Sequence, residues 1–300
     1  MSRKYPIDKQ FGFFAKFKPP FFGAMLPLGR LATGGMWKEL ERHKTVNFCK
    51  HNVGGVEVVA ISPIGQVGKL PCLVYLHGGA FVFDGSFMHY RLAVQYAVQC
   101  NCVVAFVRYG LAPKHKHPTQ IEQCFNVLQW VANGGLPNAA SDHVAVAGDS
   151  AGGFLCANVV QLACQNSIKL HFQMLIYPVV DCDMSTPSMK SFCDTPMWNS
   201  KLNAKMWKWY LGKGGKAQSL LSVSVHPNTP PTFVEVCQFD CLHDEGLYYA
   251  QMLQNAGACV EISQNQGLFH GFEIVDCPTT RQIVQRRVAY VNKMWQREQK

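Results

Sequence analysis

The chain has 300 residues, of which 48% are hydrophobic and 16% are charged, so it can bury a large core as one α/β domain with an insertion or as two ordinary domains. The formal net charge is +9, but the basic residues are scattered and no basic run is interleaved with aromatic residues, which argues against nucleic-acid binding. No run of roughly 18 apolar residues is free of charge and proline, so a membrane span is not expected.

The N-terminal residues, 1 to about 45, are basic and then rich in Phe, Pro and Gly. Lys16, Lys18, Pro19 and Pro20 interrupt the apolar part, so no signal-peptide core forms and we interpret the segment as part of the mature protein. The thirteen cysteines are irregularly spaced and include no C-x-x-C pair, which predicts reduced, mostly buried thiols in a cytoplasmic protein.

Short apolar runs rich in β-branched residues alternate with stretches of helical length. The predicted strands are 72–76, 102–107, 143–148, 172–177 and 232–236, and the predicted helices include 88–99 and 120–133. This alternation predicts a mostly parallel sheet with helices on both faces. Residues 1–45 and about 181–214, the second with Trp198, Trp207 and Trp209, depart from it and are candidates for a separate layer over the sheet.

Residues 144–157 place a serine between an apolar run and a run of small residues. The segment 148–152, GDSAG, fits the pattern G-x-S-x-G. A predicted strand leads into it and residues 154–164 can leave it as a helix, which is the strand–turn–helix setting of a nucleophile elbow. Small neighbours let the backbone pass closely through such a strained turn. The segment predicts Ser150 as a nucleophile, with a plain glycine turn as the alternative.

The run HGGA at 77–80 directly follows the predicted strand 72–76. Amides without bulky side chains can face a ligand, as in HGGG-type loops that form an oxyanion hole together with the residue after the nucleophile. The alternative is a loop whose glycines merely turn the chain. The pattern gives four candidate donors, the amides of Gly78, Gly79, Ala80 and Ala151.

The candidate acid is Asp240, which comes just after the predicted strand 232–236. Parallel sheets place ligand-binding side chains at the carboxyl ends of their strands. Asp244 and Glu245 are the competing carboxylates, and we expect them to support the first turn of the following helix.

The candidate base is His270, which follows another strand-like run at 259–263; a packed core histidine is the alternative. The chain order Ser150, Asp240, His270 is the order of α/β hydrolases and differs from those of chymotrypsin and subtilisin. Together the three residues predict a catalytic triad.

Seven motifs in sequence make the chain resemble the hormone-sensitive-lipase-like carboxylesterases, or family IV esterases, of the α/β-hydrolase fold. They cover roughly residues 70–275 and are HGGAFVFDG (77–85), YGLAPKHKHP (109–118), GDSAGG (148–153), LIYPVVD (175–181), WKWYLG (207–212), FDCLHDEG (239–246) and FHGF (269–272). The resemblance implies a mostly parallel central sheet flanked by helices, a helical cap, and hydrolysis of short- to medium-chain acyl esters without a cofactor or a metal ion.

The resemblance also implies how the chain is divided. Residues 1–45 would be the N-terminal part of the cap, 46–180 the first part of the core, 181–214 the cap insertion and 215–300 the second part of the core. Aromatic side chains of the cap would line an apolar pocket for the acyl or alcohol group, unless they are ordinary packing residues. The candidate substrate-binding residues are Phe13, Phe17, Phe21, Trp198 and Trp207.

The departures from the family pattern concern the width of the oxyanion hole, which Ala80 would narrow slightly while keeping its N–H, and charge. Relatives typically read HGGG where this chain has Ala80 in the last position. In the run that relatives write D-Y-R-L-A-P-E, Arg108 and Lys114 replace the acids and Gly110 replaces the arginine. Any ion-pair network there must therefore be rewired.

Two other functions remain open. An amidase, deacetylase or formamidase would use the same triad, and a small-molecule receptor on this scaffold would bind without catalysis, although the presence of His270 argues against it. The expected partner is a small ester, with no nucleic acid and no integral membrane span. Weak contact of the Phe-rich face with a lipid surface and a homodimer are further hypotheses.

Overall fold

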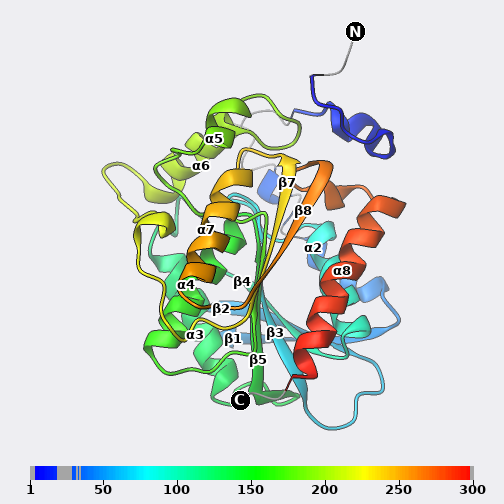
Figure 1. Ribbon diagram of the computed structural model, residues 1–300. Helices are drawn as coiled ribbons and strands as arrows, with labels where there is room; N and C mark the ends of the chain where they lie inside the picture. The colour runs from blue at the N-terminus through cyan, green and yellow to red at the C-terminus, as the bar shows by residue number, and fades with distance from the viewer. Residues whose placement is uncertain (1–3, 19–28, 32, 34, 298–300) are drawn as a thin grey trace.

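An eight-stranded sheet forms the centre of the computed structural model, which describes residues 4–18, 29–31, 33 and 35–297 (Figure 1). The strand order is β1-β2-β4-β3-β5-β6-β7-β8. Strands from β4 to β8 in that order pair in parallel, while β1, β2 and β4 pair antiparallel. The strands are β1 (Val46–Val53), β2 (Val56–Pro63), β3 (Leu70–Leu76), β4 (Val103–Arg108), β5 (Ala139–Asp149), β6 (Gln173–Ile176), β7 (Thr232–Phe239) and β8 (Val260–Phe269).

The parallel strands confirm the prediction from the apolar runs, but the hairpin of β1 and β2 was not predicted. Its turn contains Gly54 at φ 58° and Gly55 at φ 86°, the left-handed conformations of a tight hairpin turn. Strand β1 lies at the sheet edge, and only Val46 of its residues is fully buried. An edge strand of this kind carries no continuous apolar run, so the sequence pattern does not predict it. Strand β2 does carry such a run, at 58–61, which was not among the predicted strands.

Helices cover both faces of the sheet, as expected. The clusters of buried side chains place α3, α4 and α7 on one face and α2 and α8 on the other, which Figure 1 shows as two layers. The helices of the two layers are α2 (Phe87–Gln99), α3 (Thr119–Ala132), α4 (Ala151–Gln165), α7 (His243–Asn255) and α8 (Pro278–Trp295). Within the described part of the chain, no helix is long and apolar enough to cross a membrane.

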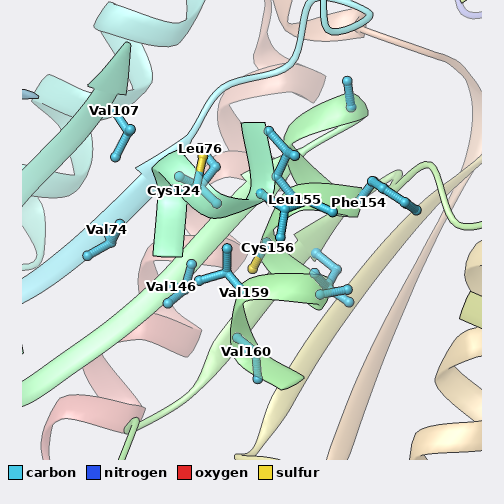
Figure 2. Packing of buried hydrophobic residues seen from close by; sticks show 14 of the residues in the cluster. Val74, Leu76, Val107, Cys124, Val146, Phe154, Leu155, Cys156, Val159 and Val160 are labelled. Carbon is cyan, nitrogen blue, oxygen red and sulfur yellow. The ribbon is translucent and has the colours of Figure 1, made fainter. Parts of the chain in front are cut away.

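Helix α4 packs closely on the sheet. Figure 2 shows Val159 of α4 next to Val146 of β5, and Cys156 of α4 belongs to the same buried cluster. At the start of α4, a Cβ added to Gly152 would lie 1.9 Å from the backbone oxygen of Leu76. Only a residue without a side chain allows this approach, so the first turn of α4 is fixed against the carboxyl end of β3.

The 3-10 helix η1 (Lys9–Ala15) and the helices α5 (Pro187–Ser191) and α6 (Ser200–Leu211) lie beyond the carboxyl ends of β7 and β8 (Figure 1). The 3-10 helix η2 (Met36–Arg42) packs against α2 instead. All four belong to the two regions that depart from the strand–helix alternation, and η3 (Leu220–Ser222) and η4 (Phe272–Ile274) are further short turns. The two regions contact one another, because Met197 donates its backbone N–H to the Phe17 carbonyl at 2.9 Å.

Candidate active site

Ser150 lies in the sharp turn between β5 and α4. Its backbone has φ 55° and ψ −121°, a strained conformation for a residue with a side chain. The turn is held on both sides, since Ser150 donates its N–H to Ile176 at 2.9 Å and accepts from Val179 at 3.0 Å. The turn therefore places the hydroxyl at the carboxyl ends of the strands.

His270 joins Ser150 to Asp240 in one line of hydrogen bonds. The imidazole Nδ1 lies 2.7 Å from Asp240 Oδ2 and Nε2 lies 2.8 Å from Ser150 Oγ. A carboxylate can only accept, so Nδ1 carries the proton and Nε2 is left to accept the proton of the hydroxyl. Asp240 is fully buried, while His270 and Ser150 retain 8% and 6% of their exposure. Three residues far apart in sequence thus form the arrangement of a nucleophile, a base and an orienting acid.

The competing carboxylates lie elsewhere. Asp244 and Glu245 occupy the first turn of α7, as predicted. Asp244 Oδ2 accepts the backbone N–H of Ser188 at 2.7 Å, and Glu245 Oε1 accepts that of Val180 at 2.7 Å. Burial raises the pKa of Glu245 well above its ordinary value. Of these three carboxylates, Asp240 is the one that contacts His270.

The loop from 77 to 86 runs beside the elbow. Gly79, Ala80 and Phe81 all have positive φ values, of 110°, 56° and 61°. A Cβ added to Gly78 would lie 2.3 Å from Asp149 Oδ2, so the loop passes directly over the residue before Ser150. Within the described residues, the amides of Gly79 and Ala80 donate to no backbone carbonyl. Ala151 begins α4, where helix amides lack an intrahelical acceptor. These three amides are free to bind an anion.

Asp149, the residue before Ser150, is hydrogen-bonded to side chains just beyond both ends of the 77–86 loop. It accepts hydrogen bonds from the Tyr75 hydroxyl at 2.8 Å and from His89 Nε2 at 3.1 Å. His89 Nδ1 in turn accepts the Ser86 backbone N–H at 2.9 Å, so Nε2 carries the proton. Burial alone would raise the pKa of Asp149, but His89 and the Tyr75 hydrogen bond outweigh it and hold that pKa below its ordinary value.

The charge changes noted in the sequence produce a new ion-pair network. Arg108, which stands where relatives carry an acid, pairs with Asp84 of the loop and with Glu57 of β2. Arg108 Nε lies 3.0 Å from Asp84 Oδ2. Gly110 leaves room for the ring of His115, whose Cγ would lie 2.5 Å from an added Cβ. The ion pairs of Arg108 thus attach the far end of the loop to β4 and β2.

The aromatic candidates for substrate binding lie in different surroundings. Trp198 is buried, with its ring centroid 5.9 Å from that of His270. Trp207 packs on Phe154 at 5.3 Å, between α6 and α4. Phe13 is 69% exposed and Phe17 is half-buried, with their rings 5.1 Å apart. Phe21 lies outside the described residues.

The described residues around Ser150 form no metal centre. Among the described residues, no group of three or more His, Cys, Asp or Glu side chains could hold a metal ion. A cavity of about 1080 Å³ lies at the opposite end of the sheet, beside Lys169, His171 and Pro231. It touches none of the residues around Ser150.

Comparisons with known proteins were made for the whole chain. Residues 73–274 match the model of a family described as having the alpha/beta hydrolase fold. Esterase LipI and carboxylesterase NlhH, both of Mycobacterium tuberculosis, are each 34% identical over 217 residues, which are 68% of this chain and 66% and 67% of those proteins. The match therefore spans about two thirds of the length of these relatives. The solved structure of esterase LipW from Mycobacterium marinum superposes with a TM-score of 0.89 at 25% identity, over 97% of both chains.

Proposed function

This chain belongs to the α/β hydrolase family, in its branch of hormone-sensitive-lipase-like carboxylic ester hydrolases, and we propose that it hydrolyses short- to medium-chain acyl esters through Ser150, His270 and Asp240. The observation that carries the proposal is the continuous line of hydrogen bonds from Asp240 through His270 to the strained Ser150. The similarity to esterases of Mycobacterium tuberculosis supports the choice of an ester as substrate.

The proposed reaction is acyl transfer in two halves. His270 Nε2 takes the proton from Ser150 Oγ as the oxygen attacks the ester carbonyl, and Asp240 stabilises the imidazolium that forms. The amides of Gly79, Ala80 and Ala151, with Gly78 as a further donor, bind the tetrahedral oxyanion. His270 then gives the proton to the leaving alcohol. Water repeats the sequence on the acyl-enzyme, which releases the acid and restores the serine.

We propose that residues 1–45 and 181–214 together form a cap over this site. Two hydrogen bonds between the segments support this proposal: Met197 N–H to the Phe17 carbonyl, and the Tyr5 hydroxyl to Asp194 Oδ1 at 2.6 Å. Trp198 supports a role for the second segment in substrate binding, because its ring lies next to His270. Phe13 and its neighbours on η1 are better explained by weak contact with a lipid surface.

The first experiment measures hydrolysis of p-nitrophenyl acetate, butyrate, octanoate and palmitate. We expect activity to peak at the short or medium chains, and Ser150→Ala to lower it at least about 10³-fold because the nucleophile is lost. Ser167→Ala is the matched control, because Ser167 also has a positive φ, of 57°, and lies just beyond the other end of α4. It should retain wild-type activity.

Two results would count against the proposal. Equal activity in wild type and Ser150→Ala would exclude Ser150 as the nucleophile. Activity on 4-nitroacetanilide that exceeds activity on the esters, and that also depends on Ser150, would make the protein an amidase with the same triad.

A further inference from the structure

Three buried charged side chains lie directly behind the loop that carries His270. Arg287 of α8, Glu235 of β7 and Glu273 of η4 have side chains that are at most 1% exposed. Arg287 donates to Glu235 Oε2 from Nε at 3.0 Å and to Glu235 Oε1 from Nη2 at 2.5 Å. The same Nη2 also donates to Glu273 Oε1. We call these residues the buried triplet.

The buried triplet holds one more carboxylate than charge balance needs. Glu235 already meets the guanidinium with both oxygens, the strongest geometry for such a pair. Burying a second carboxylate beside one arginine is costly unless its other oxygen is also satisfied. The ion pair between α8 and β7 therefore does not explain why Glu273 is there.

The second oxygen of Glu273 accepts a hydrogen bond from Tyr177. The Tyr177 hydroxyl lies 2.9 Å from Glu273 Oε2, and its ring centroid lies 4.6 Å from that of His270. Tyr177 directly follows β6, has φ 34° and donates its N–H to the Glu235 carbonyl at 2.6 Å. Its neighbour Ile176 accepts the backbone N–H of Ser150. The phenol ring thus lies beside the imidazole, on the residue that follows the backbone partner of Ser150.

We propose that Tyr177 and Glu273 are positioning residues for His270. Arg287 fixes the Glu273 carboxylate, the carboxylate fixes the Tyr177 hydroxyl, and the phenol ring then limits rotation of the imidazole away from Asp240 and Ser150. Glu273 is also linked to His270 through the tight turn at Gly271, whose φ is 69°. The inference rests on the proposed function, because the orientation of His270 matters only if His270 is the general base.

The test compares Tyr177→Phe and Glu273→Gln with Glu235→Gln. The first two weaken the bond that fixes the phenol ring, while Glu235→Gln removes an equal charge from the buried triplet and keeps that bond. We expect kcat on p-nitrophenyl butyrate to fall about tenfold in Tyr177→Phe and Glu273→Gln, with KM within about twofold of wild type, because a misoriented base slows the chemical step without changing ester binding. Glu235→Gln should lower the unfolding midpoint and leave kcat within about twofold.

Two outcomes would overturn the inference. Wild-type kcat in Tyr177→Phe would show that the hydroxyl does not orient His270, and this variant changes a single oxygen atom, so the fold should survive. An equal loss of kcat in all three variants would show that the buried triplet supports the whole fold and does not act through Tyr177.

A second readout needs no substrate and separates this inference from the proposed function. The proton shared by His270 Nδ1 and Asp240 should give a low-field resonance in the proton NMR spectrum of the wild-type protein. We expect it to broaden through exchange in Tyr177→Phe and to remain sharp in Glu235→Gln. A wild-type protein inactive on every ester would refute the proposed function alone, whereas an unchanged resonance in Tyr177→Phe would refute the positioning role alone.

Discussion

Ala80, one of the candidate oxyanion donors, has a strained backbone conformation. Its φ of 56° is a left-handed conformation, and it stands where related loops carry glycine. An L-residue with a Cβ pays roughly 1–2 kcal/mol for that conformation. The neighbouring Gly79 has φ 110° and its Cβ position lies 2.8 Å from the Phe83 carbonyl oxygen, so there glycine is required. The loop thus tolerates a side chain at one position and excludes it at the next.

Ala80→Gly is expected to stabilise the protein. Relief of the left-handed strain exceeds the extra flexibility of glycine in the unfolded chain, which costs about 0.4–1 kcal/mol, so the free energy of unfolding should rise by roughly 0.5–1 kcal/mol. Urea denaturation measures it. Gly79→Ala is the opposite control and should destabilise by more than about 1 kcal/mol. A lower stability in Ala80→Gly would mean that packing of the buried methyl group outweighs the strain.

At the scale of the element, η1 combines an inner and an outer face. Phe11 is 1% exposed and packs on Phe269 at 5.3 Å, which attaches η1 to the strand before His270. Phe13 turns outward and forms a ring cluster with Phe14 and Phe17. Exposed Lys9 and Lys16 lie on either side of this cluster. An apolar patch with basic residues around it is typical of an element that contacts an anionic lipid surface.

Charge reversal on η1 tests that contact. Lys9→Glu/Lys16→Glu should reduce co-sedimentation with phosphatidylserine-containing vesicles about tenfold or more, since each lysine near such a surface contributes about 1 kcal/mol. Lys69→Glu/Lys169→Glu is the matched control, because it changes the net charge equally with exposed residues just before β3 and β6, at the other end of the sheet. If the two double variants bound the vesicles equally, net charge alone would explain the loss of binding, and η1 would have no docking role.

At the scale of the whole molecule, the buried His77 makes stability depend on pH. Its ring is stacked between Tyr109 and Phe106, with centroids 4.4 Å and 5.4 Å away, and is fully buried. This burial lowers the pKa of His77 to about 4, against the opposing attraction of Asp84. Nδ1 donates to the Gly78 carbonyl at 2.6 Å, so the neutral ring supports the loop.

The sign of the effect follows from proton binding. The unfolded chain takes up a proton at His77 near the ordinary pKa of 6.5, whereas the folded protein does so only at about 4. Between these values the unfolded state binds more protons, so the free energy of unfolding is highest above pH 6.5 and falls as the pH falls, by roughly 3 kcal/mol for this group. The lowered pKa of Asp149 adds a further loss of stability at still lower pH.

Urea denaturation at pH 7 and pH 4 measures this loss. His77→Asn keeps a donor for the Gly78 carbonyl but does not titrate, so its stability should fall less over the same range, by roughly the contribution of His77. If the variant lost as much stability as the wild type, other groups would account for the acid sensitivity.

The sequence by itself determined the fold class, the parallel core strands and the three residues of the candidate triad. These features depend on local patterns, because apolar runs report burial on both faces and the small residues of GDSAG and HGGA report backbones that pass closely. The chain order Ser150, Asp240, His270 is that of α/β hydrolases, and it connects the three residues into one candidate triad. The sequence patterns did not reveal the β1–β2 hairpin: the edge strand β1 has mostly exposed or partly exposed side chains, and the buried apolar run of β2 was not among the predicted strands.

Only the tertiary structure decided which side chains meet across the sheet. Asp149, Arg108 and Tyr177 stand in or beside recognisable motifs, yet their partners His89, Asp84 and Glu273 lie at other places in the chain. Nothing local in the sequence identifies such pairs, because a hydrogen bond or an ion pair depends on the relative placement of elements that packing brings together. The place of Asp240 directly after a strand favours it over Asp244 and Glu245 in the sequence, but the contact of its carboxylate with His270 depends on the fold, because β7 and β8 bring the two residues together.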